Sequence, residues 1–154
     1  MKNTDKHKTL RTDDENTDFI ELLKYLDADL AGRDGDAHSF YAQFNKLDNI
    51  KHVVVAYEDA IPIGCGSIKH YDDQVMEIKR MYTSPQGRGK GIASMVLSEL
   101  EKWATELSYE QCILETGVKY PEAIGLYKKN GYVLIPNYGQ YANSADSRCF
   151  WKLL

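Results

Sequence analysis

The sequence contains few of the residues that build disulfide frameworks or metal sites. It has three cysteines, Cys65, Cys112 and Cys149, an odd number with no close pair. This pattern indicates neither a disulfide framework nor a zinc site. The four histidines also lack the spacing of metal ligands. We therefore expect no metal, and we expect cysteines that lie in predicted strands to be small core residues.

The chain also lacks long apolar runs and an excess of positive charge. No segment approaches membrane-spanning length, and the polar N-terminus, Met1 to Lys8, has no apolar region typical of a signal peptide. Lysine and arginine number 19 against 23 acidic residues, a net charge of −4, which argues against non-specific nucleic-acid binding. We expect a cytoplasmic protein with neither a nucleic-acid nor a membrane partner.

The composition that remains is that of an ordinary globular protein, with 43% hydrophobic and 27% charged residues. A chain of 154 residues is long enough to bury most of its apolar surface in one core. We therefore expect a single domain over residues 1–154.

One short segment is rich in both glycine and basic residues. Residues 86–93 read Gln-Gly-Arg-Gly-Lys-Gly-Ile-Ala, with glycine at three alternate positions between a strand-like run and an amphipathic helical pattern. Glycine lets a ligand approach the backbone closely, and the N–H groups of a starting helix attract anions. The segment therefore predicts a phosphate-binding turn.

Two common phosphate-binding motifs do not fit this segment. A Walker A loop would need glycine at position 84 and a hydroxyl residue at 91, where the chain has Ser84 and Gly91. A dinucleotide-binding fingerprint started at Gly87 or Gly89 would need glycine at 92 or 94, and neither position is glycine.

The spacing that does fit is Gln86-x-x-Gly89-x-Gly91, the pyrophosphate signature of the GNAT superfamily of acetyl-CoA-dependent N-acetyltransferases. The flanking pattern also resembles this family. A strand over 74–83 precedes the signature, and a helix follows it, with apolar residues three and four apart from Ile92 to Leu107. A buried strand over 111–117 comes next. A helix with an Asn130-Gly131 stop then matches the family's fourth helix, so the resemblance covers residues 53–133.

The resemblance implies a mixed α/β (α+β) fold with a mostly antiparallel central sheet, in which parallel strands four and five splay around the cofactor. Elsewhere, local patterns predict a first strand over 10–12, a helix capped by Thr17 or Asp18, and a shorter helix within 40–47. Two hairpins are also expected, one around 58–60 and one that pairs 132–135 with 147–153.

The resemblance further implies that acetyl-CoA is the co-substrate. Four basic residues, Lys79, Arg80, Arg88 and Lys90, crowd the phosphate turn, where they could hold a polyanion; Lys79 and Arg80 could instead pair with carboxylates. The implied cofactor-binding residues are Met81, Tyr82, Thr83, Gln86, Gly87, Arg88, Gly89, Lys90, Gly91, Ile92, Ala93 and Tyr127.

Acetyl transfer to an amine needs a polarised carbonyl, an unprotonated amine and a proton for the leaving thiol. The resemblance implies a backbone N–H near Met81 for the carbonyl. Tyr127 occupies the position of the family's catalytic tyrosine and is the candidate general acid, with a packed core aromatic as the alternative. A base is useful because an amine is largely protonated at neutral pH, and the resemblance implies Glu77 for this role, since many members of the family have a carboxylate in the fourth strand. Alternatively Glu77 pairs with Lys79, its neighbour under regular alternation, unless a bulge interrupts the strand.

These residues predict an N-acetyltransferase that moves an acetyl group from acetyl-CoA to a primary amine by direct attack in a ternary complex. The alternatives are a non-catalytic acyl-CoA-binding regulatory domain and a protein or peptide acetyltransferase. The acceptor would be a small-molecule or peptide amine, and the acidic balance favours a cationic one. The resemblance leaves a homodimer through the C-terminal strands open. Candidate acceptor contacts in the N-terminal helix are Asp27, Asp29, Arg33 and Asp34.

Overall fold

The computed structural model describes residues 6–34 and 50–154. Its strands are β1 (His7–Thr12), β2 (His52–Glu58), β3 (Ile61–Asp72), β4 (Val75–Thr83), β5 (Gln111–Gly117), β6 (Val133–Ile135) and β7 (Ser147–Leu153). Its helices are α1 (Thr17–Asp34), α3 (Ile92–Glu106) and α4 (Pro121–Lys129), with short 3-10 turns η3 (Pro85–Gly87) and η4 (Gly139–Tyr141). The helix expected within 40–47 lies outside the described residues.

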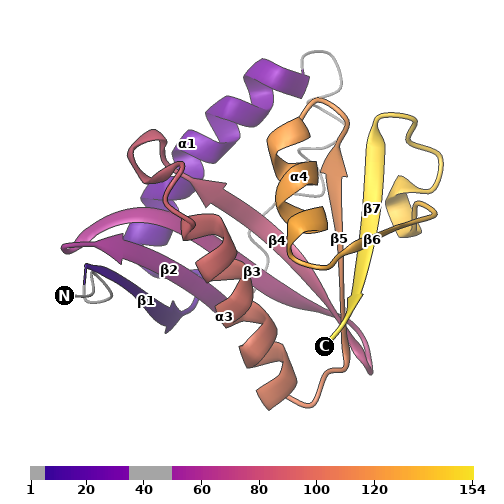
Figure 1. The fold of residues 1–154 in the computed structure, drawn as a ribbon, viewed down its shortest axis with the longest axis horizontal. Helices are drawn as coiled ribbons and strands as arrows, with labels where there is room; N and C mark the ends of the chain where they lie inside the picture. Colours follow the sequence, from indigo (N-terminus) through magenta and orange to yellow (C-terminus); the bar gives the residue numbers. More distant parts are fainter. Residues whose placement is uncertain (1–5, 35–49) are drawn as a thin grey trace.

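The strands form one seven-stranded sheet in the order β1-β2-β3-β4-β5-β7-β6 (Figure 1). Every neighbouring pair is antiparallel except β4 and β5, which are parallel. This confirms the expected mixed α/β class. None of the described helices is both long enough and apolar enough to cross a membrane.

Side chains alternate along β2, so successive residues pack into two separate hydrophobic cores, one on each face of the sheet. Val54 and Ala56 pack with the apolar face of α3, whereas Val53 and Val55 pack with α1. The two helices therefore cover opposite faces of the sheet. The periodic face predicted for α3 is confirmed as far as Ala104, which is buried, but Leu107 follows the end of the helix and is exposed.

The first turn of α1 corrects one detail of the sequence analysis. Asn16, rather than Thr17 or Asp18, caps the helix, because its Oδ1 accepts a hydrogen bond from the Phe19 N–H at 2.9 Å. Asp18 instead accepts a hydrogen bond from the Tyr57 hydroxyl at 2.6 Å. The expected cap was therefore displaced by one residue.

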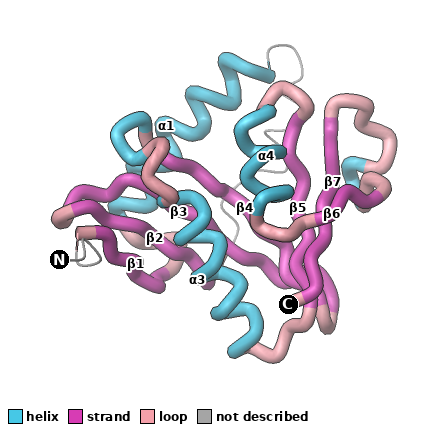
Figure 2. The backbone as a smooth tube through the Cα atoms, viewed as in Figure 1, coloured by secondary structure: helices cyan, strands magenta, loops and turns pink. Residues whose placement is uncertain are grey.

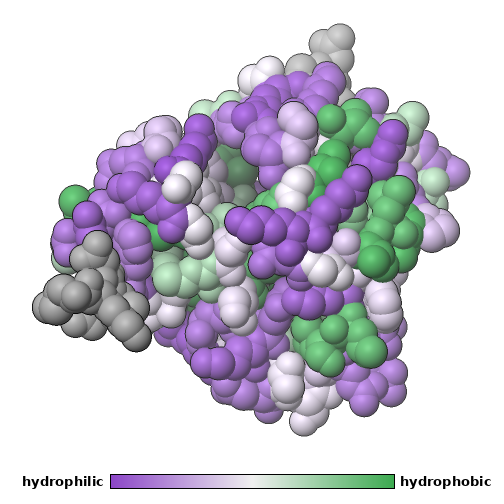
Figure 3. All heavy atoms as spheres, viewed as in Figure 1, coloured by the Kyte–Doolittle hydropathy of each residue, from purple (hydrophilic) through white to green (hydrophobic). Residues whose placement is uncertain are grey.

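Both predicted hairpins are confirmed. The β2–β3 turn holds Asp59 and Ala60 at positive φ (50° and 78°), the geometry that suits a two-residue hairpin. β6 pairs antiparallel with β7 and forms an edge of the sheet. Its Val133 and Leu134 are exposed, and hydrophobic side chains gather on the α4 and β6 side of an otherwise largely hydrophilic face (Figure 3). Homodimerisation through the C-terminal strands stays a prediction.

β4 and β5 separate soon after they meet. Their parallel register covers only Val75 to Glu77 of β4, opposite Gln111 to Ile113 of β5. Beyond Glu77 the strands diverge, and α4 packs beside the opening (Figure 2). This divergence creates the space in which the candidate site lies.

β4 also carries a bulge centred on Arg80. Cys65 of β3 is opposite Tyr82 and Ser67 is opposite Lys79, so β4 has one extra residue between these pairs. Arg80 has a φ of +60° and reaches Asp27 of α1. The bulge lies after Lys79, and the register from Glu77 to Lys79 is regular. It therefore does not separate Glu77 from Lys79, as a bulge earlier in the strand would have done.

Candidate active site

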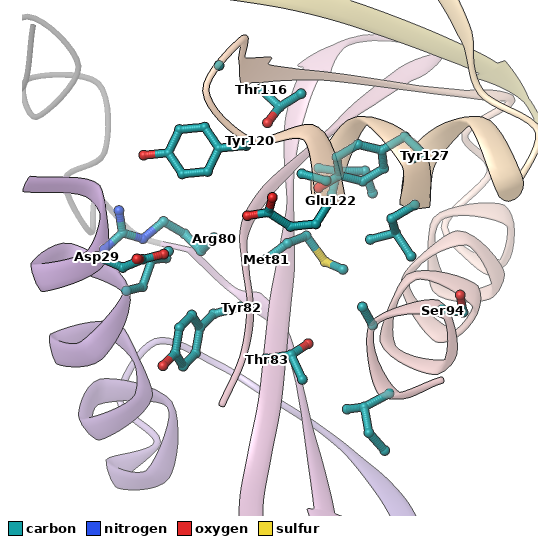
Figure 4. Close-up of a pocket in the computed structure, with 18 of the residues that line it drawn as sticks. Asp29, Arg80, Met81, Tyr82, Thr83, Ser94, Thr116, Tyr120, Glu122 and Tyr127 are labelled. Atoms are coloured by element: carbon teal, nitrogen blue, oxygen red, sulfur yellow. The ribbon is translucent and has the colours of Figure 1, made fainter. Parts of the chain in front are cut away.

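A cavity of about 730 Å³ opens between the diverging strands (Figure 4). It is lined by residues 77–83 of β4, 115–117 of β5, the start of α3, one face of α4, and Asp29 and Arg33 of α1. Its volume lies within the range of small-molecule and cofactor sites. The predicted phosphate turn and the two predicted catalytic residues border this one cavity.

The glycine-rich turn leads into α3 with its backbone open to the cavity. Gly89 and Gly91 have φ values of 75° and 77°, which L side chains rarely adopt. A Cβ at either position would meet nothing within 4 Å, so conformation rather than crowding requires glycine there. Gly91 is the N-cap of α3, and no side chain caps this end. Its first N–H groups are therefore available for an anion.

Gly87 has a different role in the same turn. It is buried, and a Cβ there would lie 3.0 Å from the Ile63 carbonyl oxygen and 3.1 Å from a Thr83 methyl group. The Ser84 N–H also donates to the Ile63 carbonyl at 2.8 Å. These contacts hold the turn against β3.

The basic residues of the turn diverge from one another. Arg88 lines the cavity, and its Nε donates to the Thr83 carbonyl at 3.2 Å. The Lys90 ammonium is instead 3.0 Å from a Glu58 carboxylate oxygen. Hydrogen bonds from His7 and Lys90 lower the pKa of Glu58 to about 2. Lys90 and Gln86 do not line the cavity, whereas the other predicted cofactor-binding residues do.

Tyr127 of α4 borders the cavity and is buried. Its ring packs edge-on against Tyr132, with centroids 5.8 Å apart. Burial raises the pKa of the Tyr127 phenol, and the negative charge of Glu115 adds to the rise. The phenol therefore remains protonated at neutral pH and can act as a hydrogen-bond donor inside the cavity.

Glu77 is the last β4 residue paired with β5. It is buried, and its Oε2 accepts a hydrogen bond from the Tyr138 hydroxyl at 2.6 Å. Burial and the charge of Glu77 raise the pKa of Tyr138. Lys79 lies on the same face, where burial lowers its pKa and the charge of Glu77 opposes that shift. Glu77 thus lies at the branch point of the strands in a polar, enclosed setting.

The link between β6 and β7, residues 136–146, forms one wall of the site. Tyr141 lines the cavity and packs edge-on against Tyr138. Tyr138 is a residue that the sequence analysis missed. Its hydrogen bond to Glu77 joins positions 61 residues apart, and no local sequence pattern specifies such a contact.

At the other wall, side chains of α1 and α4 that line the cavity contact each other. Arg33 forms an ion pair with Glu122, and its guanidinium lies 4.9 Å from the centre of the Tyr120 ring. Asp29 is 3.5 Å from the Arg33 Nε. The predicted contacts Asp29 and Arg33 therefore do border the site, and the side chain of Asp34 lies outside the description.

Arg80 is incompletely paired. Its Nη2 donates to Asp27 Oδ1 at 3.0 Å, but its Nε and Nη1 are buried without a hydrogen-bond partner. The side chain borders the cavity and extends from β4 toward α1 beside Asp29 (Figure 4). Buried polar groups are nearly always paired, so these N–H groups call for an explanation.

The cysteines take no part in the cavity. Cys65, Cys112 and Cys149 are free and buried, in β3, β5 and β7 respectively. Their expected role as core residues is confirmed, and none of them lines the cavity. Across residues 6–34 and 50–154, no group of three or more His, Cys, Asp or Glu side chains is arranged to hold a metal ion.

Comparison with known proteins gives consistent results. The sequence model of the Acetyltransferase (GNAT) family matches residues 12–132. The IAA acetyltransferase of Azospirillum brasilense is 33% identical over 130 residues, which are 79% of this chain and 81% of that protein. A Klebsiella pneumoniae structure solved as that of an acyl-CoA N-acyltransferase is 26% identical, with a TM-score of 0.80 over 96% of this chain and 97% of its own. The fold is also shared with the PaiA N-acetyltransferase of Thermoplasma acidophilum, solved in complex with coenzyme A, at 18% identity and a TM-score of 0.70 over 96% and 99% of the chains.

Proposed function

Because the chain belongs to the Acetyltransferase (GNAT) family, we propose that it transfers an acetyl group from acetyl-CoA to a small primary amine by direct attack in a ternary complex. The observation that carries this proposal is the uncapped N-terminus of α3, which opens through two left-handed glycines into the cavity between β4 and β5.

The cofactor half of the proposal rests on this helix end. The N–H groups of Ile92 and Ala93 and the cation of Arg88 would hold the pyrophosphate of acetyl-CoA, because a helix N-terminus favours negative charge. The Thermoplasma relative was solved with coenzyme A, which supports the same ligand here. The thioester would then lie toward the branch point of β4 and β5.

Tyr127 is the proposed proton donor to the leaving thiolate. Tyr127 borders the cavity, and a tyrosine phenol is protonated at neutral pH, so its proton is available when the carbon–sulfur bond breaks. The phenol would donate that proton to sulfur and recover one from solvent.

Glu77 is the proposed base for the attacking amine. The carboxylate is at the branch point, where it can accept a proton directly or through a water molecule. Its hydrogen bond from Tyr138 fixes the carboxylate orientation. Glu77→Gln should therefore lower the rate most at neutral pH and least at high pH, where the amine loses its proton to solvent.

Two further features support direct transfer to a small acceptor. The cysteines are buried away from the cavity, so an acyl-enzyme on a thiol has no candidate among them. The ion pair of Arg33 with Glu122 joins α1 to α4 beside the cavity and would limit the room for a peptide, which favours a compact amine.

The proposal is tested by titrating acetyl-CoA calorimetrically and then measuring CoA release with a panel of primary amines. Tyr127→Phe should reduce kcat by about a hundredfold with acetyl-CoA affinity little changed. Tyr132→Phe is a matched control, because Tyr132 is also buried but hydrogen-bonds Glu101 and does not line the cavity. Saturable binding without CoA release by any amine would favour a non-catalytic acyl-CoA-binding domain.

A further inference from the structure

Arg80 borders the cavity with two buried guanidinium nitrogens that have no hydrogen-bond partner among the described residues, and its position is specific. Without the bulge, alternation would place Arg80 on the α3 face with Met76 and Ile78, both of which pack in that core. The bulge turns it to the α1 side, where it meets Asp27. A non-glycine residue at a φ of +60° carries backbone strain of about 1 kcal/mol or more.

The partner that Arg80 does have leaves most of the guanidinium unsatisfied. The Arg80 side chain is 3% exposed, whereas that of Asp27 is 58% exposed, so water screens this ion pair from one side. Nε and Nη1 are buried and without any partner. Asp29 lies beside Arg80 in Figure 4, but its ion pair is with Arg33.

A buried guanidinium with free N–H groups is costly unless something accepts from it. A guanidinium matches the planar, two-oxygen geometry of a carboxylate, which can accept two N–H groups at once. Arg80 borders the same cavity as Glu77 and Tyr127. An acceptor bound in this cavity would therefore lie next to the Arg80 side chain while its amine lies near the branch point.

We propose that Arg80 binds a carboxylate of the acceptor, so that the acceptors of this protein are amino acids or other amines that carry a carboxylate. The inference rests on the proposed acetyl transfer and adds the substrate class. It also replaces the cationic acceptor suggested by net charge. Net charge describes the whole surface, whereas Arg80 is a single buried cation inside the site.

The spacing along β4 fits an amino-carboxylate. Arg80 follows Glu77 by three residues, which is at most about 10 Å along the strand, because the bulge at Arg80 shortens the path. The carboxylate would lie at Arg80, toward α1, and the amine would lie between Glu77 and the thioester. Arg80 would thus position the acceptor and take no part in proton transfer.

The test compares matched acceptors that differ only at the carboxyl group. Leucine, methionine, phenylalanine, lysine and glutamate would each be assayed against the corresponding α-amide with acetyl-CoA, by CoA release. The amide has the less basic amine, so any bias from amine protonation favours the amide. Wild-type protein should prefer at least one free amino acid over its amide by at least about tenfold in kcat/KM, the effect of roughly one charge-assisted contact.

Variants of Arg80 test whether the preference for the free amino acid over its amide depends on this residue. Arg80→Met should abolish it by raising KM for the amino acid, with KM for acetyl-CoA unchanged. Arg80→Lys should retain part of it, because the charge remains but the fork is lost. Arg148→Met is the matched control and should keep the preference, since Arg148 is exposed on β7 and does not line the cavity. Thermal unfolding of each variant verifies folding, and Arg80→Met should not be less stable, because it removes unpaired buried donors.

The outcomes separate this inference from the proposed function. If wild-type protein acetylates amides or simple amines as well as the amino acids, or if Arg80→Met keeps the preference, acetyl transfer stands and the carboxylate site is wrong. If no amine is acetylated, the proposed transfer fails. Calorimetric titration of the CoA-saturated protein with the same amino acids and amides then decides the inference separately. Selective binding of an amino acid that Arg80→Met removes would uphold the site, and its absence would overturn it.

Discussion

Replacing Arg88 by alanine should weaken acetyl-CoA binding much more than replacing Lys90, although both residues belong to the same basic turn. Arg88 borders the cavity, and only its Nε is engaged, with the Thr83 carbonyl. Its remaining N–H groups are free to meet a phosphate. Lys90 is bound to Glu58 and lies outside the cavity, so it must leave that partner to reach a ligand.

The magnitudes follow from these two settings. A hydrogen bond to a charged group contributes about 1.5–3 kcal/mol when shielded, and Arg88 is exposed, so we expect the lower end. Loss of about 1.5 kcal/mol corresponds to roughly a tenfold increase in Kd. Lys90→Ala removes a screened surface charge and should change Kd by less than about threefold.

The assay is calorimetric titration with acetyl-CoA at two salt concentrations. The effect of Arg88→Ala should shrink as salt is raised, because salt screens exposed charges. Lys128→Ala controls for net charge, since Lys128 is exposed on α4 and does not line the cavity. A loss with Lys90→Ala equal to or greater than that with Arg88→Ala would refute the assignment of the phosphate contact to Arg88.

Three further predictions concern stability and mechanism. Gly66→Ala should destabilise the fold by about 1–3 kcal/mol, because its Cβ would lie 2.4 Å from Met81 Sδ and 2.9 Å from Leu100 Cδ1. Gly32→Ala, where a Cβ meets nothing within 4 Å, should not lower stability, and equal thermal shifts for the two variants would contradict this reasoning. Burial and the charge of Lys51 lower the pKa of His52, so the unfolded chain binds the proton more tightly. Stability should therefore fall as pH drops below the ordinary histidine pKa of about 6.5. Urea unfolding at several pH values should show a shallower fall for His52→Gln, and an unchanged slope would argue against the assignment. Replacing Cys65, Cys112 and Cys149 together by alanine should leave kcat within about tenfold of wild type in folded protein, whereas a loss above about a hundredfold would require a thiol in the reaction.

The order of elements and most of their bounds could be predicted from the sequence, because local patterns dictate them. The apolar residues of α3 recur at helical spacing and are buried on one face, and β5 has the expected limits of 111–117. Gly131 has a φ of 90° after α4, as the predicted stop requires. Periodicity suffices for such features because burial of one face determines them.

Contacts made across the fold could not be predicted in the same way. Tyr138 reaches Glu77 from a link without periodicity, and no local signal specifies that contact. The engagement of Lys90 with Glu58 depends on the way the phosphate turn folds back over β2. The sequence predicted that Arg80 either holds a polyanion near the phosphate turn or pairs with a carboxylate. The structure shows the second arrangement, an ion pair with Asp27. The face of the sheet from which the Arg80 side chain projects, however, depends on a bulge in β4 that regular alternation does not predict.

The bulge in β4 also bears on how such a protein can diversify. If Arg80 is left out, Met76, Ile78 and Met81, all of which pack in or against the α3 core, fall on one face in unbroken alternation. Arg80 is thus an inserted residue whose side chain takes no part in the packing of the α3 core. The side chain at this position can therefore be exchanged without repacking the core. Under the proposed carboxylate contact, a change of acceptor would need only a substitution at this position, and the phosphate-binding side of the cavity would stay as it is.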